Sequence, residues 1–98
     1  MSWATHLIKE LQAGNAVEFR PRGNSMTGRV SSGQLCRVEP LTSDPQKGDV
    51  VLCKVKGSQY LHLVSGIRGD QFQISNNHGH VNGWTSRKNV FGILTKVT

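Results

Sequence analysis

Residues 48–67 read GDVVLCKVKGSQYLHLVSGI, and this stretch decides the expected fold. Its first part is a Gly-led turn followed by the apolar run Val50-Val51-Leu52-Cys53, which is typical of a buried strand. Lys56-Gly57-Ser58 then turns the chain, and residues 59–67 form a second strand. The stretch therefore predicts two antiparallel strands joined by a tight turn.

Further strands extend this pair into a mostly β domain. Residues 17–20, 33–40, 71–75 and 90–97 place alternating apolar and polar side chains between turn residues, as the strands of an antiparallel meander do. Residues 76–83 read NNHGHVNG, and this composition predicts a polar loop. We expect a single domain over residues 1–98, with its β body in residues 17–97.

One short helix is expected within residues 1–14. Ser2 is a suitable N-cap and Gly14 stands where a C-terminal cap belongs. Between them, apolar side chains recur at helical spacing, namely those of Trp3, Leu7, Ile8 and Leu11. This stripe predicts a helix packed on the sheet, with contact to a partner or a lipid surface as the alternative.

Composition excludes several classes of protein. The 98 residues suit one domain, and 36% hydrophobic residues against 18% charged ones predict a folded globule. The longest apolar run, residues 50–53, is far shorter than the roughly 20 residues of a membrane-spanning helix. No secretory signal is visible, so we expect a cytoplasmic protein in which Cys36 and Cys53 are reduced core thiols.

The formal net charge of +6 raises the possibility of an anionic partner. The basic residues are scattered, without a basic run or an aromatic stacking platform, so nucleic acid is expected to bind only through a generic basic surface. Arg20, Arg22 and Arg29 do cluster in the sequence, on either side of Ser25. These arginines are candidates for contacts with a substrate backbone or with acidic side chains.

A serine and a histidine together suggest nucleophilic chemistry. Residues 22–26 read RGNSM, which sets Ser25 beside a glycine turn. His62 lies in the strand 59–67, where alternation places Leu61 and Leu63 toward the core and His62 on the opposite face. An unperturbed imidazole titrates near pH 6.5 and is a competent base at neutral pH. The two side chains are the parts of a nucleophile and its base.

Three segments, in this order along the chain, resemble the LexA-like and signal-peptidase-like serine peptidases. They are the turn at residues 22–26, the Gly48-Asp49 turn with the strand that follows, and residues 60–64. That family has a Gly-x-Ser-Met nucleophile turn and a Gly-Asp-led strand, with a lysine or histidine base in the next strand. The resemblance covers about residues 17–97. It implies a fold of coiled β-sheets with Ser25 as the nucleophile and His62 as the base, as in the Ser-His branch of the family.

The resemblance also implies an activity. We expect a soluble serine endopeptidase that cleaves a peptide bond in an extended peptide or protein substrate, with no cofactor. Exposed strand edges would bind this substrate by β-augmentation, and a pocket would select small residues. Substrate contacts are expected at Arg22, Met26, Arg29 and Tyr60.

Two further roles complete the expected site. The backbone N–H of Ser25, with the N–H or the side chain of Asn24, is the natural oxyanion donor at a glycine turn. In the Ser-His branch an acidic residue orients the histidine, but the matching stretch here, residues 74–77, reads ISNN. We therefore expect Ser75 or Asn76 to fix the tautomer by a neutral hydrogen bond, and turnover to be slow.

Two alternatives stay open. The first is a catalytically weak or inactive module that binds peptides or proteins on the same fold, which the missing acid favours. The second is a metal site in which His78 and His80 supply two imidazoles and His62 a third. No nearby carboxylate or paired cysteine completes that set, so no metal is expected.

Overall fold

The computed structural model describes residues 3–23 and 25–98 and shows a mostly β protein with one short N-terminal helix, as expected. The helix is α1 (Thr5–Gln12), and the strands are β1 (Val17–Phe19), β2 (Cys36–Pro40), β3 (Val50–Val55), β4 (Ser58–Arg68), β5 (Gln71–Ser75), β6 (Val81–Ser86) and β7 (Val90–Val97), with the 3-10 turn η1 (Arg87–Asn89) before β7. Within the described ranges, no helix has the length and apolarity needed to cross a membrane.

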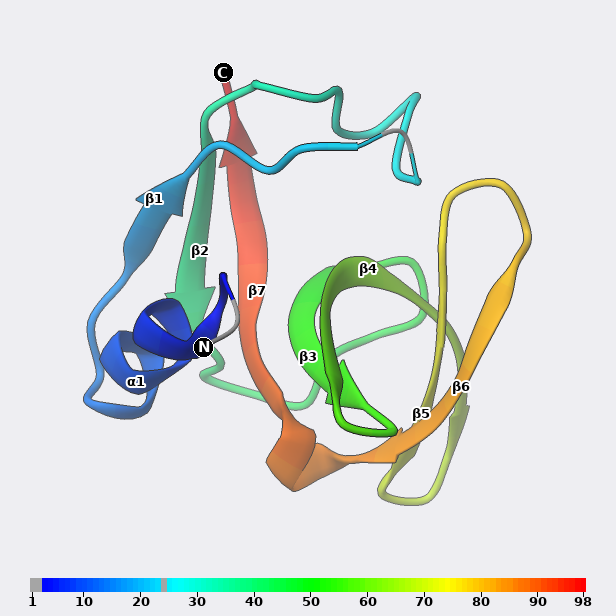
Figure 1. Ribbon diagram of the computed structural model, residues 1–98. Coiled ribbons are helices and arrows are strands. Elements are labelled where there is room, and N and C mark those ends of the chain that lie inside the picture. Colours follow the sequence, from blue (N-terminus) through cyan, green and yellow to red (C-terminus); the bar gives the residue numbers. More distant parts are fainter. Residues whose placement is uncertain (1–2, 24) are drawn as a thin grey trace.

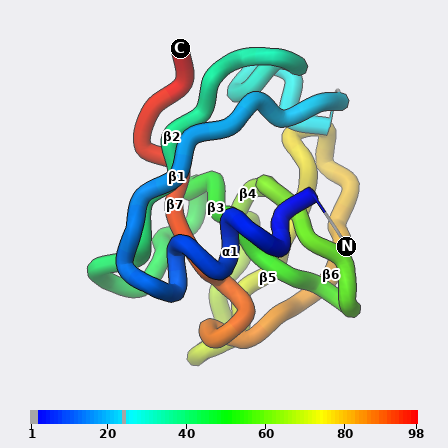
Figure 2. The backbone as a smooth tube through the Cα atoms, turned by 60° about the vertical axis from the view of Figure 1, so that its left-hand side comes forward, coloured from blue at the N-terminus to red at the C-terminus, as the bar shows by residue number. Residues whose placement is uncertain are grey.

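All seven strands belong to one antiparallel sheet in the order β1-β2-β7-β3-β4-β5-β6. Figure 1 shows that the sheet is strongly coiled, with β3 and β4 curling through its middle and β1, β2 and β7 lying apart from β5 and β6. Figure 2 shows α1 in front of the sheet, and the helix contacts β7, β1 and β2. The coiling brings loops from the two ends of the sheet order close together.

The hairpin of β3 and β4 forms at the stretch that predicted it. Val55 pairs with Ser58 across a two-residue turn, in which Lys56 and Gly57 have φ values of 50° and 85°. This is the conformation that a type I′ hairpin turn requires. Val50 and Leu52 lie in one hydrophobic cluster, and Val51 lies in another on the opposite face of β3. Burial on both faces explains why this strand is apolar without alternation.

The two clusters hold the sheet together. The first packs α1 against β2, β3 and β4, and the second fills the coil between β3, β4 and β5 with Phe72, Ile74 and Val64. Cys36 and Cys53 are both buried and free, as expected. Burial raises the pKa of Cys53 to about 12, so its thiol is inert at neutral pH.

The helix is shorter than residues 1–14. It begins after Ala4, and the expected N-cap, Ser2, lies outside the described residues. Its C-terminal end matches the expectation, because the N–H of Gly14 bonds to the carbonyl of Leu11 at 3.0 Å and that of Asn15 to Glu10 at 2.9 Å. Gly14 has a φ of 92°, which suits a glycine at this cap.

The expectation of a polar loop over residues 76–83 is wrong in its second half. Val81 begins strand β6, which pairs with β5 along its length. Thr85 also donates a hydrogen bond to the carbonyl of Lys54 at 2.7 Å, which ties β6 to β3. Pairing with β5 overrides the turn-like composition of Asn82 and Gly83.

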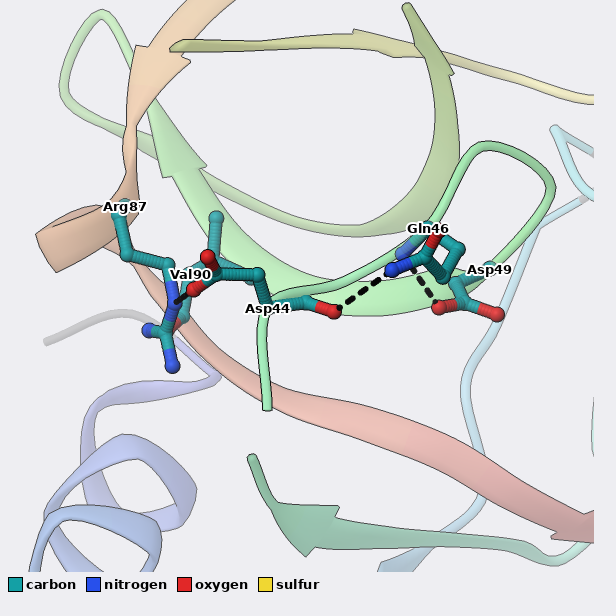
Figure 3. Close-up of polar contacts among 5 residues, drawn as sticks. All are labelled: Asp44, Gln46, Asp49, Arg87 and Val90. Atoms are coloured by element: carbon teal, nitrogen blue, oxygen red, sulfur yellow. Dashed lines mark hydrogen bonds and ion pairs between the residues drawn. The ribbon is translucent and has the colours of Figure 1, made fainter. Parts of the chain in front are cut away.

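The segment before β3 is held by side chains on both of its sides (Figure 3). Arg87 forms an ion pair with Asp44 at 3.1 Å and donates to the carbonyl of Val90 at 3.3 Å. The carboxylate of Asp49 accepts a hydrogen bond from the backbone N–H of Gln46 at 2.7 Å. These contacts fix the Gly-Asp turn that leads into β3.

Candidate active site

Ser25 lies in a tight turn over residues 25–29, between β1 and β2. The carbonyl of Met26 accepts hydrogen bonds from the N–H groups of Arg29 at 3.0 Å and Val30 at 2.8 Å, and the Met26 side chain is buried in the first cluster. Ser25 itself is exposed. The buried methionine thus anchors the turn and leaves the serine hydroxyl at the surface.

The loop between β5 and β6, at the other end of the sheet order, forms hydrogen bonds to this turn. The N–H of Asn77 donates to the carbonyl of Ser25 at 2.8 Å, and its side-chain amide donates to the carbonyl of Thr27 at 2.8 Å. Arg29 donates from Nε to Oδ1 of Asn77 at 3.0 Å. In Figure 1 the loop between β1 and β2 lies beside the loop between β5 and β6 at one end of the molecule. Asn77 therefore positions the turn that carries Ser25.

His62 comes to the serine from β4, in the middle of the sheet. It pairs with Val51 of β3 and is 7% exposed. Its Nε2 lies 3.1 Å from Oγ of Ser25, and its Nδ1 lies 2.7 Å from Oδ1 of Asn82 on β6. The ring of Tyr60 stacks on the imidazole, with centroids 4.8 Å apart. The ring is held on three sides.

The hydrogen bonds select one tautomer of His62. An amide oxygen can only accept, so the imidazole proton sits on Nδ1 and is donated to Asn82. Nε2 then carries the lone pair and accepts the hydroxyl proton of Ser25. This is the arrangement in which histidine acts as the general base of a serine nucleophile.

The pKa of His62 is lowered from its ordinary value of 6.5, chiefly because burial disfavours the imidazolium. The hydrogen bond to Asn82 raises this pKa, and the electrostatic interaction with His80 lowers it further. The imidazole is therefore neutral, and able to accept a proton, at neutral pH.

Ser75 and Asn76 do not orient the histidine, contrary to expectation. Ser75 is buried on β5 between Leu63 and Val81, and Oδ1 of Asn76 accepts from the N–H groups of His78 at 2.8 Å and His80 at 2.9 Å. Asn82 takes this role instead. It was missed because residues 76–83 suggested a loop, whereas strand β6 is what carries Asn82 across β5 to the imidazole. Asn24, the oxyanion candidate, lies outside the described residues.

A hollow of about 500 Å³ opens beside the pair, and Ser25 and His62 both line it. Three of the four expected substrate contacts, Arg22, Met26 and Tyr60, line it as well. Arg29 does not fit its expected role, because its guanidinium bonds to Asn77 and, at 3.2 Å, to the carbonyl of Gly48. Arg29 joins the turn at residues 25–29 to the Gly-Asp turn and is part of the scaffold of the site.

The alternative of a three-histidine metal site is not supported. Among the residues that the structure describes, no group of three or more histidine, cysteine, aspartate or glutamate side chains is arranged to hold a metal ion. Both ring nitrogens of His62 are directed at Ser25 and Asn82. His62 is thus engaged in the serine site.

No model of a known protein family matches this chain, and no curated protein sequence matches it. The geometry of Ser25, His62 and Asn82 is therefore the main guide to function.

Proposed function

We propose that this protein is a serine peptidase in which Ser25 is the nucleophile, His62 the general base and Asn82 the residue that orients the base. One observation carries the proposal: a continuous chain of hydrogen bonds runs from Ser25 Oγ through His62 to Asn82, at 3.1 Å and 2.7 Å, in the wall of a substrate-sized hollow. The resemblance of three segments to the LexA-like and signal-peptidase-like peptidases supports the same assignment.

The chemistry follows from these positions. Oγ of Ser25 attacks the carbonyl carbon of the scissile peptide, while Nε2 of His62 takes the hydroxyl proton. The imidazolium then donates that proton to the leaving amine as the C–N bond breaks, which leaves an ester on Ser25. A water molecule attacks the ester, its proton passes to Nε2 and then returns to Ser25 Oγ. The backbone N–H of Ser25 is our candidate donor to the oxyanion.

The neutral third residue sets the expected rate. A carboxylate would stabilise the imidazolium by charge, whereas the Asn82 amide offers only a neutral hydrogen bond. Asn82 still fixes the tautomer and the plane of the ring, as the asparagine of Cys-His-Asn proteases does. We therefore expect turnover that is slow but depends on all three residues.

A fluorophosphonate probe tests the proposal, with mass spectrometry to locate the modified residue. We expect the wild-type protein to be labelled at Ser25, Ser25→Ala to be unlabelled, and His62→Gln to be labelled about 100-fold more slowly, since a general base contributes at least that factor. Ser31→Ala is the matched control, because Ser31 lines the same hollow and its hydrogen bonds to Gln34 are made by its backbone N–H and carbonyl.

A peptide library read by mass spectrometry then reports cleavage by the same four proteins. Equal labelling of the wild type and Ser25→Ala would contradict the peptidase proposal. A wild type that binds library peptides but is neither labelled nor active would favour the second candidate, a peptide-binding module, for which the neutral Asn82 is the observation.

A further inference from the structure

The hollow beside Ser25 contains only positive formal charge. Arg20 and Arg22 line it, and no acidic residue within the described ranges does. Arg20 is held in place by a hydrogen bond of 2.8 Å to the carbonyl of Gly33, so its charge stays at the wall. A site of this kind favours substrates with carboxylates near the scissile bond.

A second hollow continues this charge pattern. Three lysines line it, Lys9 from α1, Lys54 from β3 and Lys88 from η1, with apolar surface from Ile8 and Phe91. The two hollows share Gln59 in their walls, so they adjoin one another on the same side of the protein. Across the described residues, no acidic side chain lines the second hollow either.

Three of the six acidic side chains pair with cations outside the two hollows. Glu18 and Glu39 pair with Arg37, at 3.9 Å and 3.4 Å, and Asp44 pairs with Arg87. In contrast, none of the five cations of the two hollows forms an ion pair with another described residue. Five of the twelve lysines and arginines therefore line the two hollows with no acidic side chain beside them in the described lining.

We infer that the substrate is an acidic protein segment that extends along both hollows and presents its scissile bond to Ser25. The inference rests on the proposed function for its catalytic part and on the two hollows for its charge preference. Apolar side chains line both hollows together with the cations, which suits a peptide of mixed acidic and apolar residues. One face of Tyr60 is already covered by the imidazole of His62, so this ring is a poor platform for stacking nucleic-acid bases.

Binding to Ser25→Ala tests the charge preference without any turnover. We would measure fluorescence anisotropy with a labelled glutamate-rich peptide, a matched peptide with glutamine in place of glutamate, and a single-stranded oligonucleotide of equal charge. At an ionic strength of about 0.15 M we expect the glutamate peptide to bind about tenfold more tightly than the glutamine peptide, because several weak charge pairs add together. We also expect the oligonucleotide to bind more weakly than the glutamate peptide.

Two charge-matched pairs of substitutions, made in the Ser25→Ala protein, locate the binding site. Lys54→Gln with Lys88→Gln removes two charges from the second hollow, whereas Lys47→Gln with Lys96→Gln removes two from outside both hollows. We expect the first pair to abolish most of the glutamate preference, and the second to change it less than twofold or so.

Equal affinity for the two peptides, equal effects of the two pairs, or tighter binding of the oligonucleotide would overturn the inference. Its failure is distinguishable from that of the peptidase proposal, which is read by labelling of wild-type Ser25. Labelling of Ser25 without a preference for the glutamate peptide would support the peptidase proposal and contradict the acidic substrate. A preference for the glutamate peptide without labelling would support an acidic-peptide docking site and contradict the peptidase proposal.

Discussion

At the scale of the residue, the site depends on how one imidazole is held. His62 is almost fully buried, donates from Nδ1 to Asn82 and faces Ser25 with Nε2. Burial keeps the ring neutral, which suits a base, while the hydrogen bond to Asn82 keeps it in the correct tautomer. In the proposed reaction, the residue at position 82 would therefore control how strongly the His62 imidazolium is stabilised.

Substitutions of Asn82 measure this control. We expect Asn82→Ala to slow fluorophosphonate labelling about tenfold, the value of one neutral hydrogen bond in the transition state. Asn82→Asp should label faster than the wild type, because a carboxylate stabilises the imidazolium and raises the pKa of His62.

The pH profile of the labelling rate separates these effects from a loss of structure. For the wild type, the acid limb should lie below pH 6.5, since the pKa of His62 is lowered. For Asn82→Asp the limb should move upward, by about one pH unit. An Asn82→Asp protein with an unmoved limb and a rate below that of Asn82→Ala would contradict the role assigned to Asn82.

At the scale of the element, two loops, the central strand β4 and the edge strand β6 assemble the site. The turn at residues 25–29 brings Ser25, the proposed nucleophile, β4 brings His62, the proposed base, and β6 brings the Asn82 amide that orients it. Asn77, from the loop before β6, connects these parts because it hydrogen-bonds to the backbone of Ser25 and Thr27 and to the side chain of Arg29.

A substitution at Gly28 tests the contact between the turn at residues 25–29 and the loop that carries Asn77. Its φ is 101°, and a Cβ added there would lie 3.0 Å from the side-chain nitrogen of Asn77. Gly57, in the β3–β4 turn, also has a positive φ of 85°, but a Cβ there would meet nothing within 4 Å. Alanine at either position costs about 1–2 kcal/mol of backbone strain.

We expect Gly28→Ala to lower the labelling rate of Ser25 about 10- to 100-fold, since displacement of Asn77 misplaces the nucleophile. Gly57→Ala should lose a similar free energy of unfolding in urea but keep the wild-type labelling rate. Equal labelling rates in the two variants would show that the contact with Asn77 does not position Ser25.

Much of the element scale could be predicted from the sequence. Strands β3 and β4 and the turn between them follow from local patterning, and so does the C-terminal cap of α1 at Gly14. Strand β6 could not be predicted in this way, because Asn82 and Gly83 favour a turn when only their neighbours in the chain are considered. Its strand conformation comes from pairing with β5.

At the scale of the whole molecule, the buried base links the site to stability. In the folded protein the pKa of His62 is lowered, so between that lowered value and about 6.5 the unfolded chain binds more protons than the folded one. The contribution of His62 to the free energy of unfolding therefore falls as the pH falls below about 6.5, and it levels off once the folded-state pKa is passed.

Urea denaturation across this pH range checks the linkage. We expect the wild type to lose stability on acidification and His62→Gln to lose less over the same interval, because glutamine cannot titrate. If the free energy of unfolding fell equally with pH in the two proteins, the pKa of His62 would not be lowered by folding. His6→Gln is a suitable control, since His6 is exposed on α1.

The amino-acid sequence by itself determined the β-rich class and the central hairpin. It also suggested Ser25 and His62 as a nucleophile and its base. These features depend on local alternation, turn residues and the chemistry of two side chains. The tertiary structure alone decided the third residue, the scaffold role of Arg29 and the cationic lining of the hollows. Ser25, His62 and Asn82 are separated by 37 and 20 positions and meet only because the coiled sheet brings distant strands and loops together, which local patterning does not encode.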